Sequence, residues 1–282
     1  MEDIFQYTFV NTEMQNKNIY FYTMSSFVFK AISYLKYFAK RKDEHSLHSP
    51  FVFDFYNHVI KDDRQFYSFK EIENLRKILL DDESEIDKID FGASGKGGKR
   101  KISLIAKNSK APEFGRILFR LTDFFGCKKI IEIGTSLGIS GSYIKLANVN
   151  SDFYSLEGCP NTAAIAKKTF ETLKLNNVNI LIGEFDFSFK NILKKLDKID
   201  LVFFDGNHTR EATLKYFNQA LNHIHNETIF VFDDIYWSKE MSSAWNEIKN
   251  HSKVKITIDL FEIGIVFFRE QQKEKQHYIL KI

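Results

Sequence analysis

The stretch KIIEIGTSLGIS, residues 129–140, decides how the chain folds. It begins as an apolar run and then turns through Gly134 and Gly138 into a segment of helical character. A strand, a glycine bend and a helix in succession are typical of an open α/β sheet, in which ligands lie across the carboxyl ends of the strands. We therefore expect a parallel sheet that begins near residue 129, with a ligand site at its first bend.

The same rhythm continues towards the C-terminus. Short apolar runs alternate with helical segments of about 10 to 15 residues, which is the pattern of a parallel sheet covered by helices. The last two runs are separated only by a bend, so we expect them to pair in antiparallel fashion. The expected strands are 129–134, 152–158, 178–183, 199–206, 228–234, 254–261 and 264–270, and the expected helices between them are 140–148, 160–175, 188–196, 210–225 and 240–250.

The N-terminal part reads as helices and loops. Residues 24–42 and 68–80 have the periodicity of amphipathic helices. Ser49 and Pro50 have the pattern of an N-cap and a first helical position, and Pro112 opens a further helix. We divide the chain into a helical N-terminal extension with a basic glycine-rich loop (1–111), an α/β domain (112–271) and a C-terminal tail (272–282).

Composition and charge exclude several classes of protein. With 282 residues, of which 44% are hydrophobic and 27% charged, the chain is globular rather than disordered. A net charge of +3 with both signs interspersed does not predict a nucleic-acid partner. There are two cysteines, Cys127 and Cys159, and the N-terminus does not have the pattern of a signal peptide. These features predict a cytoplasmic protein.

The most apolar N-terminal segment, residues 19–39, is interrupted by Lys30 and Lys36, so it does not predict a transmembrane helix. The amphipathic residues 24–42 fit two interpretations. They form either a helix that covers a neighbouring element or one that makes peripheral contact with a membrane surface or a partner.

A second glycine-rich stretch, GASGKGGKRK at 92–101, invites comparison with a phosphate-binding loop. Such a loop needs the pattern G-x-x-x-x-G-K-[ST]. If Lys99 is its lysine, the first glycine falls on Ala93 and the hydroxyl residue on Arg100. The stretch therefore predicts no ATP site. It is either a basic surface loop or a loop that helps to hold an anionic substrate.

Three aspartates follow two expected strands, Asp205 after one and Asp233 and Asp234 after the next. The carboxyl ends of parallel strands meet at one edge, so these carboxylates should converge and repel unless a cation, protons or substrate groups neutralise them. A hard ion such as Mg²⁺ prefers oxygen ligands of this kind. His208 lies three residues after Asp205, and a histidine is suited to take a proton close to neutral pH.

The pattern E-x-G-x-x-x-G at residues 132–138 resembles motif I of the class I S-adenosylmethionine-dependent methyltransferases, and the resemblance extends over the α/β domain. It implies a doubly wound, mostly parallel sheet of seven strands in the order 3-2-1-4-5-7-6, with strand 7 reversed. It also implies S-adenosylmethionine as the cofactor. Glycines that merely pack a helix on a strand would not explain Glu132 and Glu157 at two adjacent strand ends.

The resemblance implies a role for each part of the motif. Glu132 and Gly134 are expected near the methionine amino group, and Ser140 near its carboxylate at a helix N-terminus, which attracts anions. Glu157 is expected at the ribose hydroxyls. The third expected strand ends in Gly-Glu near the adenine, where the family often has Gly followed by Asp or Asn. The cofactor residues implied are Glu132, Gly134, Thr135, Ser136, Gly138, Ser140, Glu157, Gly183, Glu184 and Asp205.

The acidic strand ends are similar to those of catechol O-methyltransferase, in which an Asp and an Asp-Asn pair hold magnesium, although the pair here is Asp-Asp. The D-G-x-H form at residues 205–208 also resembles macrolide-sugar O-methyltransferases. The resemblance implies O-methylation of a small-molecule acceptor, with His208 and Asp205 as catalytic residues. It leaves open whether Asp205, Asp233 and Asp234 bind Mg²⁺.

Two alternatives remain at this point. One is a catalytically idle cofactor-binding module that acts through a partner or a membrane surface. The other is an N-methyltransferase that needs no metal. The sequence also leaves a homodimer open.

Overall fold

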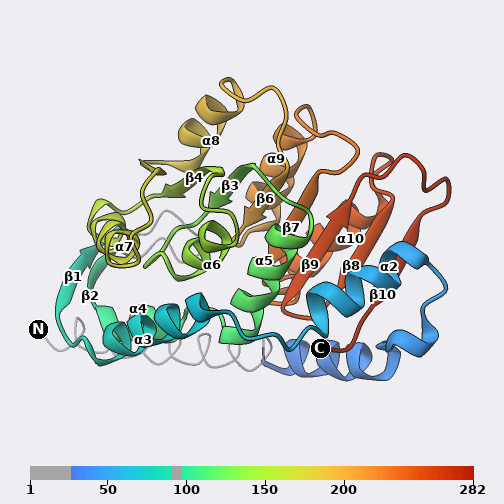
Figure 1. The fold of residues 1–282 in the computed structure, drawn as a ribbon, viewed down its shortest axis with the longest axis horizontal. Coiled ribbons are helices and arrows are strands. Elements are labelled where there is room, and N and C mark those ends of the chain that lie inside the picture. Colours follow the sequence, from blue (N-terminus) through green and yellow to red (C-terminus); the bar gives the residue numbers. More distant parts are fainter. Residues whose placement is uncertain (1–26, 90–96) are drawn as a thin grey trace, which may run out of the picture.

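The computed structural model describes residues 27–89 and 97–282, and an eight-stranded sheet runs through its centre (Figure 1). The start of the predicted 24–42 helix and residues 92–96 of the glycine-rich stretch lie outside the described residues. The strands in spatial order are β10 (Gln276–Ile279), β8 (Ile256–Asp259), β9 (Ile263–Phe267), β7 (Ile229–Asp233), β6 (Leu201–Phe204), β3 (Lys129–Ile133), β4 (Asp152–Glu157) and β5 (Val178–Ile182).

The order predicted for seven strands is confirmed, because β5-β4-β3-β6-β7-β9-β8 is the sequence order 3-2-1-4-5-7-6. Strand β9 is antiparallel to both of its neighbours, β7 and β8, as expected for the reversed strand. The C-terminal segment 272–282 differs from the tail that we expected. It supplies the eighth strand, β10, which pairs in parallel with β8 at the edge of the sheet.

Alternating residues of the central strands pack on opposite faces of the sheet. Ile130, Leu201 and Ile229 belong to one hydrophobic cluster, whereas the next residue of each strand belongs to the other. Both faces are therefore buried, which is why these strands read as continuous apolar runs. One face is covered by α5 (Pro112–Phe124), α6 (Ile139–Ala147) and α7 (Pro160–Thr172), and the other by α8 (Phe185–Leu193), α9 (Arg210–Ala220) and α10 (Lys239–Asn250).

The N-terminal elements extend the covered face. The helix α2 (Pro50–Phe55) starts at its predicted N-cap, where the Ser49 hydroxyl accepts a hydrogen bond from the Val52 backbone, and it continues into η2 (Tyr56–Ile60). Val52 and Phe55 belong to the same core cluster as the sheet, so apolar packing crosses the boundary predicted at 111/112. A short helical turn, η1 (Glu44–Ser46), precedes α2.

A second N-terminal group lies at one end of the molecule (Figure 1). Here α3 (Tyr67–Asp81), predicted over 68–80, packs with α4 (Ile102–Lys107) and against α6. Where the sequence predicted only loop, β1 (Glu85–Lys88) and β2 (Gly98–Lys101) form an exposed antiparallel pair that flanks the glycine-rich stretch. That stretch is consequently not the end of a buried strand, as a phosphate-binding loop would require.

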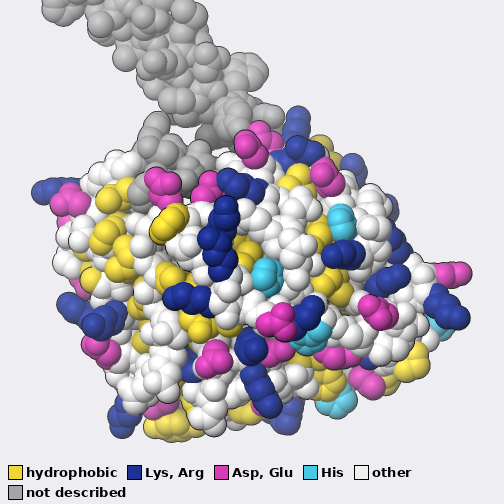
Figure 2. Space-filling view, turned by 90° about the horizontal axis from the view of Figure 1, so that it is seen from above, with side chains coloured by type: hydrophobic (Ala, Val, Ile, Leu, Met, Phe, Trp, Pro, Cys, Tyr) yellow, Lys and Arg dark blue, Asp and Glu magenta, His cyan; other side chains and the backbone are white. Residues whose placement is uncertain are grey.

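The first described segment is a helix over residues 27–40. Its inner side holds Tyr37, whose hydroxyl donates to the Leu280 carbonyl oxygen at 2.6 Å, and Tyr34 packs edge-on against Phe261. Among the described helices, none is both long and apolar enough to cross a bilayer. The face of the molecule in Figure 2 carries both charge signs in scattered positions, as the modest net charge predicts.

Candidate active site

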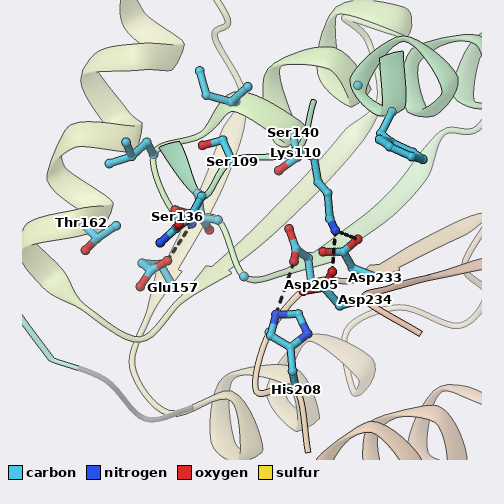
Figure 3. A pocket seen from close by; sticks show the side chains of 18 of the residues that line it. Ser109, Lys110, Ser136, Ser140, Glu157, Thr162, Asp205, His208, Asp233 and Asp234 are labelled. Carbon is cyan, nitrogen blue, oxygen red and sulfur yellow. Dashed lines mark hydrogen bonds and ion pairs between the residues drawn. The ribbon is translucent and has the colours of Figure 1, made fainter. Parts of the chain in front are cut away.

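A cavity of about 790 Å³ opens along the carboxyl ends of β3, β4, β6 and β7. One end is bounded by Ser136 and Glu157, and the other by His208, Asp233 and Lys110 (Figure 3). The predicted cofactor bend and the predicted acidic cluster therefore share one continuous space. A volume of this size holds a ligand of nucleoside size together with a small second molecule.

The bend at Gly134 brings β3 and β6 into very close approach. Gly134 has φ +102°, and a Cβ atom placed there would lie 2.1 Å from the Asp205 carbonyl oxygen. No side chain fits in that space. The glycine thus positions the Asp205 segment in addition to turning the chain towards α6.

Glu132 lies beneath the bend and is fully buried. Its carboxylate accepts hydrogen bonds from Ser140 Oγ at 2.6 Å and Ser155 Oγ at 2.5 Å. Burial raises the pKa of Glu132 to about 7, although both hydroxyls partly offset it. Glu132 does not line the cavity, whereas Ser140 does, so Glu132 can act on a ligand only by orienting its neighbour.

Glu157, at the end of β4, does line the cavity. Its two carboxylate oxygens accept hydrogen bonds from the backbone amides of Ser136, at 2.8 Å, and Cys159, at 2.9 Å. These bonds fix the carboxylate beside the bend, and burial raises the pKa of Glu157. Ser136 itself has φ +48°, an uncommon conformation for a residue with a side chain, which turns its amide towards Glu157.

The acidic end brings together Asp205, His208 and Asp233, whose potential ligand atoms all lie within 4.8 Å of one another. His208 Nε2 lies 3.7 Å from Asp205 Oδ1. Burial and the Asp233 carboxylate raise the pKa of Asp205, and burial likewise raises that of Asp233. A proton or a nearby cation is therefore needed to stabilise the pair.

That cation is Lys110, which sequence reasoning missed. Its Nζ lies 2.9 Å from Asp233 Oδ1 and 2.6 Å from Asp234 Oδ1, and Figure 3 shows the side chain pointing into the aspartates. Burial alone would lower the pKa of Lys110, but the carboxylates of Asp233 and Asp234 outweigh it and the pKa is raised. Lys110 stands in the connection between α4 and α5, far from the aspartates in sequence, and no motif marks it.

The structure does not bring every predicted residue to the cavity. Gly138, Gly183 and Glu184 lie off its wall, and Gly138 packs instead against Phe170 and Ala166 of α7. Phe185, the residue after Glu184, does line the wall, as do Lys88 and Ile89 beside the glycine-rich stretch. The predicted residues that line it are Gly134, Thr135, Ser136, Ser140, Glu157, Asp205, His208, Asp233 and Asp234.

Comparison with known proteins agrees with this geometry. Residues 131–235 match a family model described as a methyltransferase domain. No curated protein matches the chain. The family match covers the glycine bend, Glu157, His208 and the acidic strand ends, but it does not reach Lys110.

Solved methyltransferases share the fold at low identity. The SAH-bound methyltransferase PaMTH1 of Podospora anserina has a TM-score of 0.57 at 12% identity, covering 79% of this chain and 97% of its own. The O-methyltransferase of Bacillus cereus in complex with SAH has a TM-score of 0.53 at 16% identity, with coverages of 77% and 96%. TomG of Streptomyces achromogenes, in complex with SAM, has a TM-score of 0.50 at 16% identity, with coverages of 77% and 94%.

The fold, the glycine bend and the domain match agree with one another. S-adenosylmethionine also fits the cavity, because a fixed carboxylate and a glycine bend bound one end of a space large enough for it. Residues 131–235 therefore match a methyltransferase domain, and the chain shares its fold with solved methyltransferases.

Proposed function

We propose that the protein methylates a hydroxyl group of a small-molecule acceptor. The observation that carries this proposal is that one cavity joins the cofactor bend to a histidine beside a half-buried carboxylate, that of Asp205. A hydroxyl group must lose its proton as it attacks a methyl donor, and this site offers a base where the acceptor would lie.

At the cofactor end, we propose that Glu157 binds the ribose hydroxyls and that the backbone amides at the start of α6, including that of Ser140, bind the methionine carboxylate. Ser140 is oriented by Glu132, to which it donates a hydrogen bond. Gly134, Thr135 and Ser136 form the wall between these groups. Gly183 and Glu184 do not line the cavity, so we propose that their neighbour Phe185, which does, contacts the adenine in their place.

At the acceptor end, we propose that His208 takes the proton of the attacking hydroxyl. Bound S-adenosylmethionine supplies a methyl group on a positively charged sulfur, and displacement forms the O–CH₃ bond while the S–CH₃ electron pair returns to sulfur. Asp205, 3.7 Å away, stabilises the protonated imidazole. The cavity walls align donor and acceptor and exclude water from them.

Among its described residues, the structure contains only some of the free carboxylate groups that the predicted magnesium ion would need. Asp205, His208 and Asp233 offer clustered donor atoms, but Asp233 and Asp234 already form ion pairs with Lys110. The residues present do not fit a divalent ion while that ammonium group is in place. The proposed reaction therefore uses no metal ion.

Consumption of S-adenosylmethionine with phenols, sugars, carboxylates and amines as acceptors tests the proposal. We expect turnover with a hydroxyl acceptor, which His208→Asn lowers by about 10²- to 10⁴-fold without weakening cofactor binding. The same substitution at exposed His45 is the control. Turnover with amines alone would indicate an N-methyltransferase, and cofactor binding without any turnover would indicate an idle binding module.

We propose a second property for the helix of residues 27–40, namely peripheral contact with an anionic membrane surface. Its outward side exposes apolar side chains, with Phe27 76% and Leu35 66% exposed, and within the described residues nothing covers them. Residues 27–42 carry five cations and no acidic residue. An exposed apolar strip bordered by cations binds anionic lipid headgroups and the acyl boundary beneath them.

Flotation with vesicles of phosphatidylcholine alone or mixed with phosphatidylserine tests this contact. We expect binding only to the mixed vesicles, abolished by Leu35→Asp but not by Ile78→Asp, which changes an equally exposed apolar residue on α3. Dimerisation through this face, seen by light scattering and lost in Leu35→Asp, would contradict it and support the homodimer. The cytoplasmic location stays a prediction, and the two cysteines are free and buried.

A further inference from the structure

We infer that Lys110 takes the place of a divalent metal ion, so that this methyltransferase works with a fixed ammonium group at its acceptor site. The catalytic role of Lys110 rests on the proposed function. The exclusion of a metal ion by Lys110 can be tested independently of that function.

The position of Lys110 Nζ is that of a central cation. It lies 2.9 Å from Asp233, 2.6 Å from Asp234 and 3.3 Å from Glu262, each through one carboxylate oxygen. An ammonium group has three N–H donors, and three acidic side chains surround it. Its side chain is only 17% exposed, so it lies inside the site rather than at its rim.

The carboxylates are arranged to receive this cation. Asp234 has φ +54°, and its backbone amide donates to the Glu262 carbonyl oxygen at 2.8 Å, which places both acidic residues beside Lys110. Glu262 is further paired with Lys30 at 3.7 Å. Four acidic side chains and two lysines therefore meet at the acceptor end of the cavity, and mutual neutralisation holds them there.

A divalent ion and this ammonium group compete for the same oxygens. Mg²⁺ needs oxygen ligands at about 2.0–2.1 Å in octahedral geometry. The Asp233 and Asp234 oxygens that face Lys110 could reach such an ion only if the like-charged ammonium group left. Asp233 Oδ1 pairs with Lys110 without hydrogen-bond alignment, so it can still accept a hydrogen bond from the acceptor.

Lys110 also lies outside the segment that matches the methyltransferase domain model, which begins at residue 131. It is delivered by the N-terminal part of the chain, in the connection between α4 and α5, just before Pro112 starts α5. This helix packs on α6 and so holds the connection over the acidic strand ends. The cation thus comes from a part of the chain outside the matched segment.

Binding of Mn²⁺ to protein freed of metal, followed by electron paramagnetic resonance, tests the inference without an acceptor. We expect no stoichiometric binding by the unmodified protein and at least about tenfold tighter binding by Lys110→Ala, because removal of the ammonium frees the carboxylates. Adding Asp205→Asn to that variant should abolish the gain. Lys107→Ala, an exposed lysine of the preceding helix, is the control.

The inference would be overturned if the unmodified protein bound Mn²⁺ stoichiometrically and Asp205→Asn abolished this binding. So would a Lys110→Ala variant that folds and binds Mn²⁺ no more tightly. If Lys110→Ala fails to fold, Lys110→Ala combined with Asp234→Asn removes a cation and an anion together, and the same gain is expected. Loss of cofactor binding or turnover would count against the proposed function instead and would leave these Mn²⁺ results unchanged.

Discussion

At the scale of single residues, Gly134 links the two halves of the site. Its substitution by Ala should destabilise the protein by more than about 4 kcal/mol, because the new Cβ would collide with the Asp205 backbone. Chemical denaturation measures this change. Gly126→Ala is the matched control, because its φ is +59° but no atom lies within 4 Å of the added Cβ, and we expect a cost of about 1–2 kcal/mol. Equal costs at both glycines would contradict the close approach.

Glu132 makes stability depend on pH. Its pKa rises from 4.5 to about 7 on folding, so the folded state binds more protons between these values. The stability that this group contributes is fully present below its unfolded pKa and is lost as pH rises through its folded pKa. As pH rises from 4.5 to 8, the free energy of unfolding of Glu132→Gln should therefore increase by up to about 3 kcal/mol relative to that of the unmodified protein.

Denaturant titrations at both pH values measure this difference. Exposed Glu240 is the control, because Glu240→Gln removes the same charge from the first turn of α10 without freeing a buried carboxylate. If the free energies of unfolding of Glu132→Gln and the unmodified protein differ by the same amount at both pH values, Glu132 titrates as a solvated group.

The sequence predicted the site residues that stand at strand ends, because strand ends are defined by local pattern. Asp205, Asp233 and His208 converge as expected, since parallel strands bring their carboxyl ends to one edge. Lys110 could not be found in this way. Its position depends on how α5 packs, and a single lysine in a loop carries no periodic signal.

At the scale of elements, the alternation of apolar runs and helical segments was sufficient to predict the seven strands, and the family resemblance implied their order. The short strands β1, β2 and β10 were missed, each for the same reason. They lie at edges or are exposed, so their sequences lack the apolar runs of the central strands.

The strand β10 should nevertheless matter for stability. Leu280 follows it and is fully buried, and the Leu280 carbonyl oxygen accepts the hydrogen bond from Tyr37. Leu280→Ala should cost about 2–5 kcal/mol, through lost apolar contact and the cavity left behind. Ile282→Ala, two residues on and 40% exposed, should change the free energy of unfolding by less than about 0.5 kcal/mol. Similar values for both would show that β10 is not docked.

At the scale of the whole molecule, the N-terminal residues complete the site instead of merely covering it. Lys30 and Lys110 reach the acidic cluster from outside the matched domain, and Arg120 of α5 ties η2 in place by donating to the Val59 carbonyl oxygen at 2.8 Å. Local sequence pattern predicts elements, but it does not show which distant loop supplies a charge. The composition of the acceptor end of the cavity therefore depends on tertiary packing, which the sequence pattern does not show.

The most direct test of the account is a calorimetric titration of S-adenosylhomocysteine into the protein and two variants. We predict one binding site per chain, weakened at least about tenfold by Glu157→Ala, which removes the carboxylate fixed at the bend. His208→Asn, at the other end of the cavity, should bind as the unmodified protein does. A titration without heat, or equal affinity in Glu157→Ala, would contradict the assignment of this cavity to the cofactor.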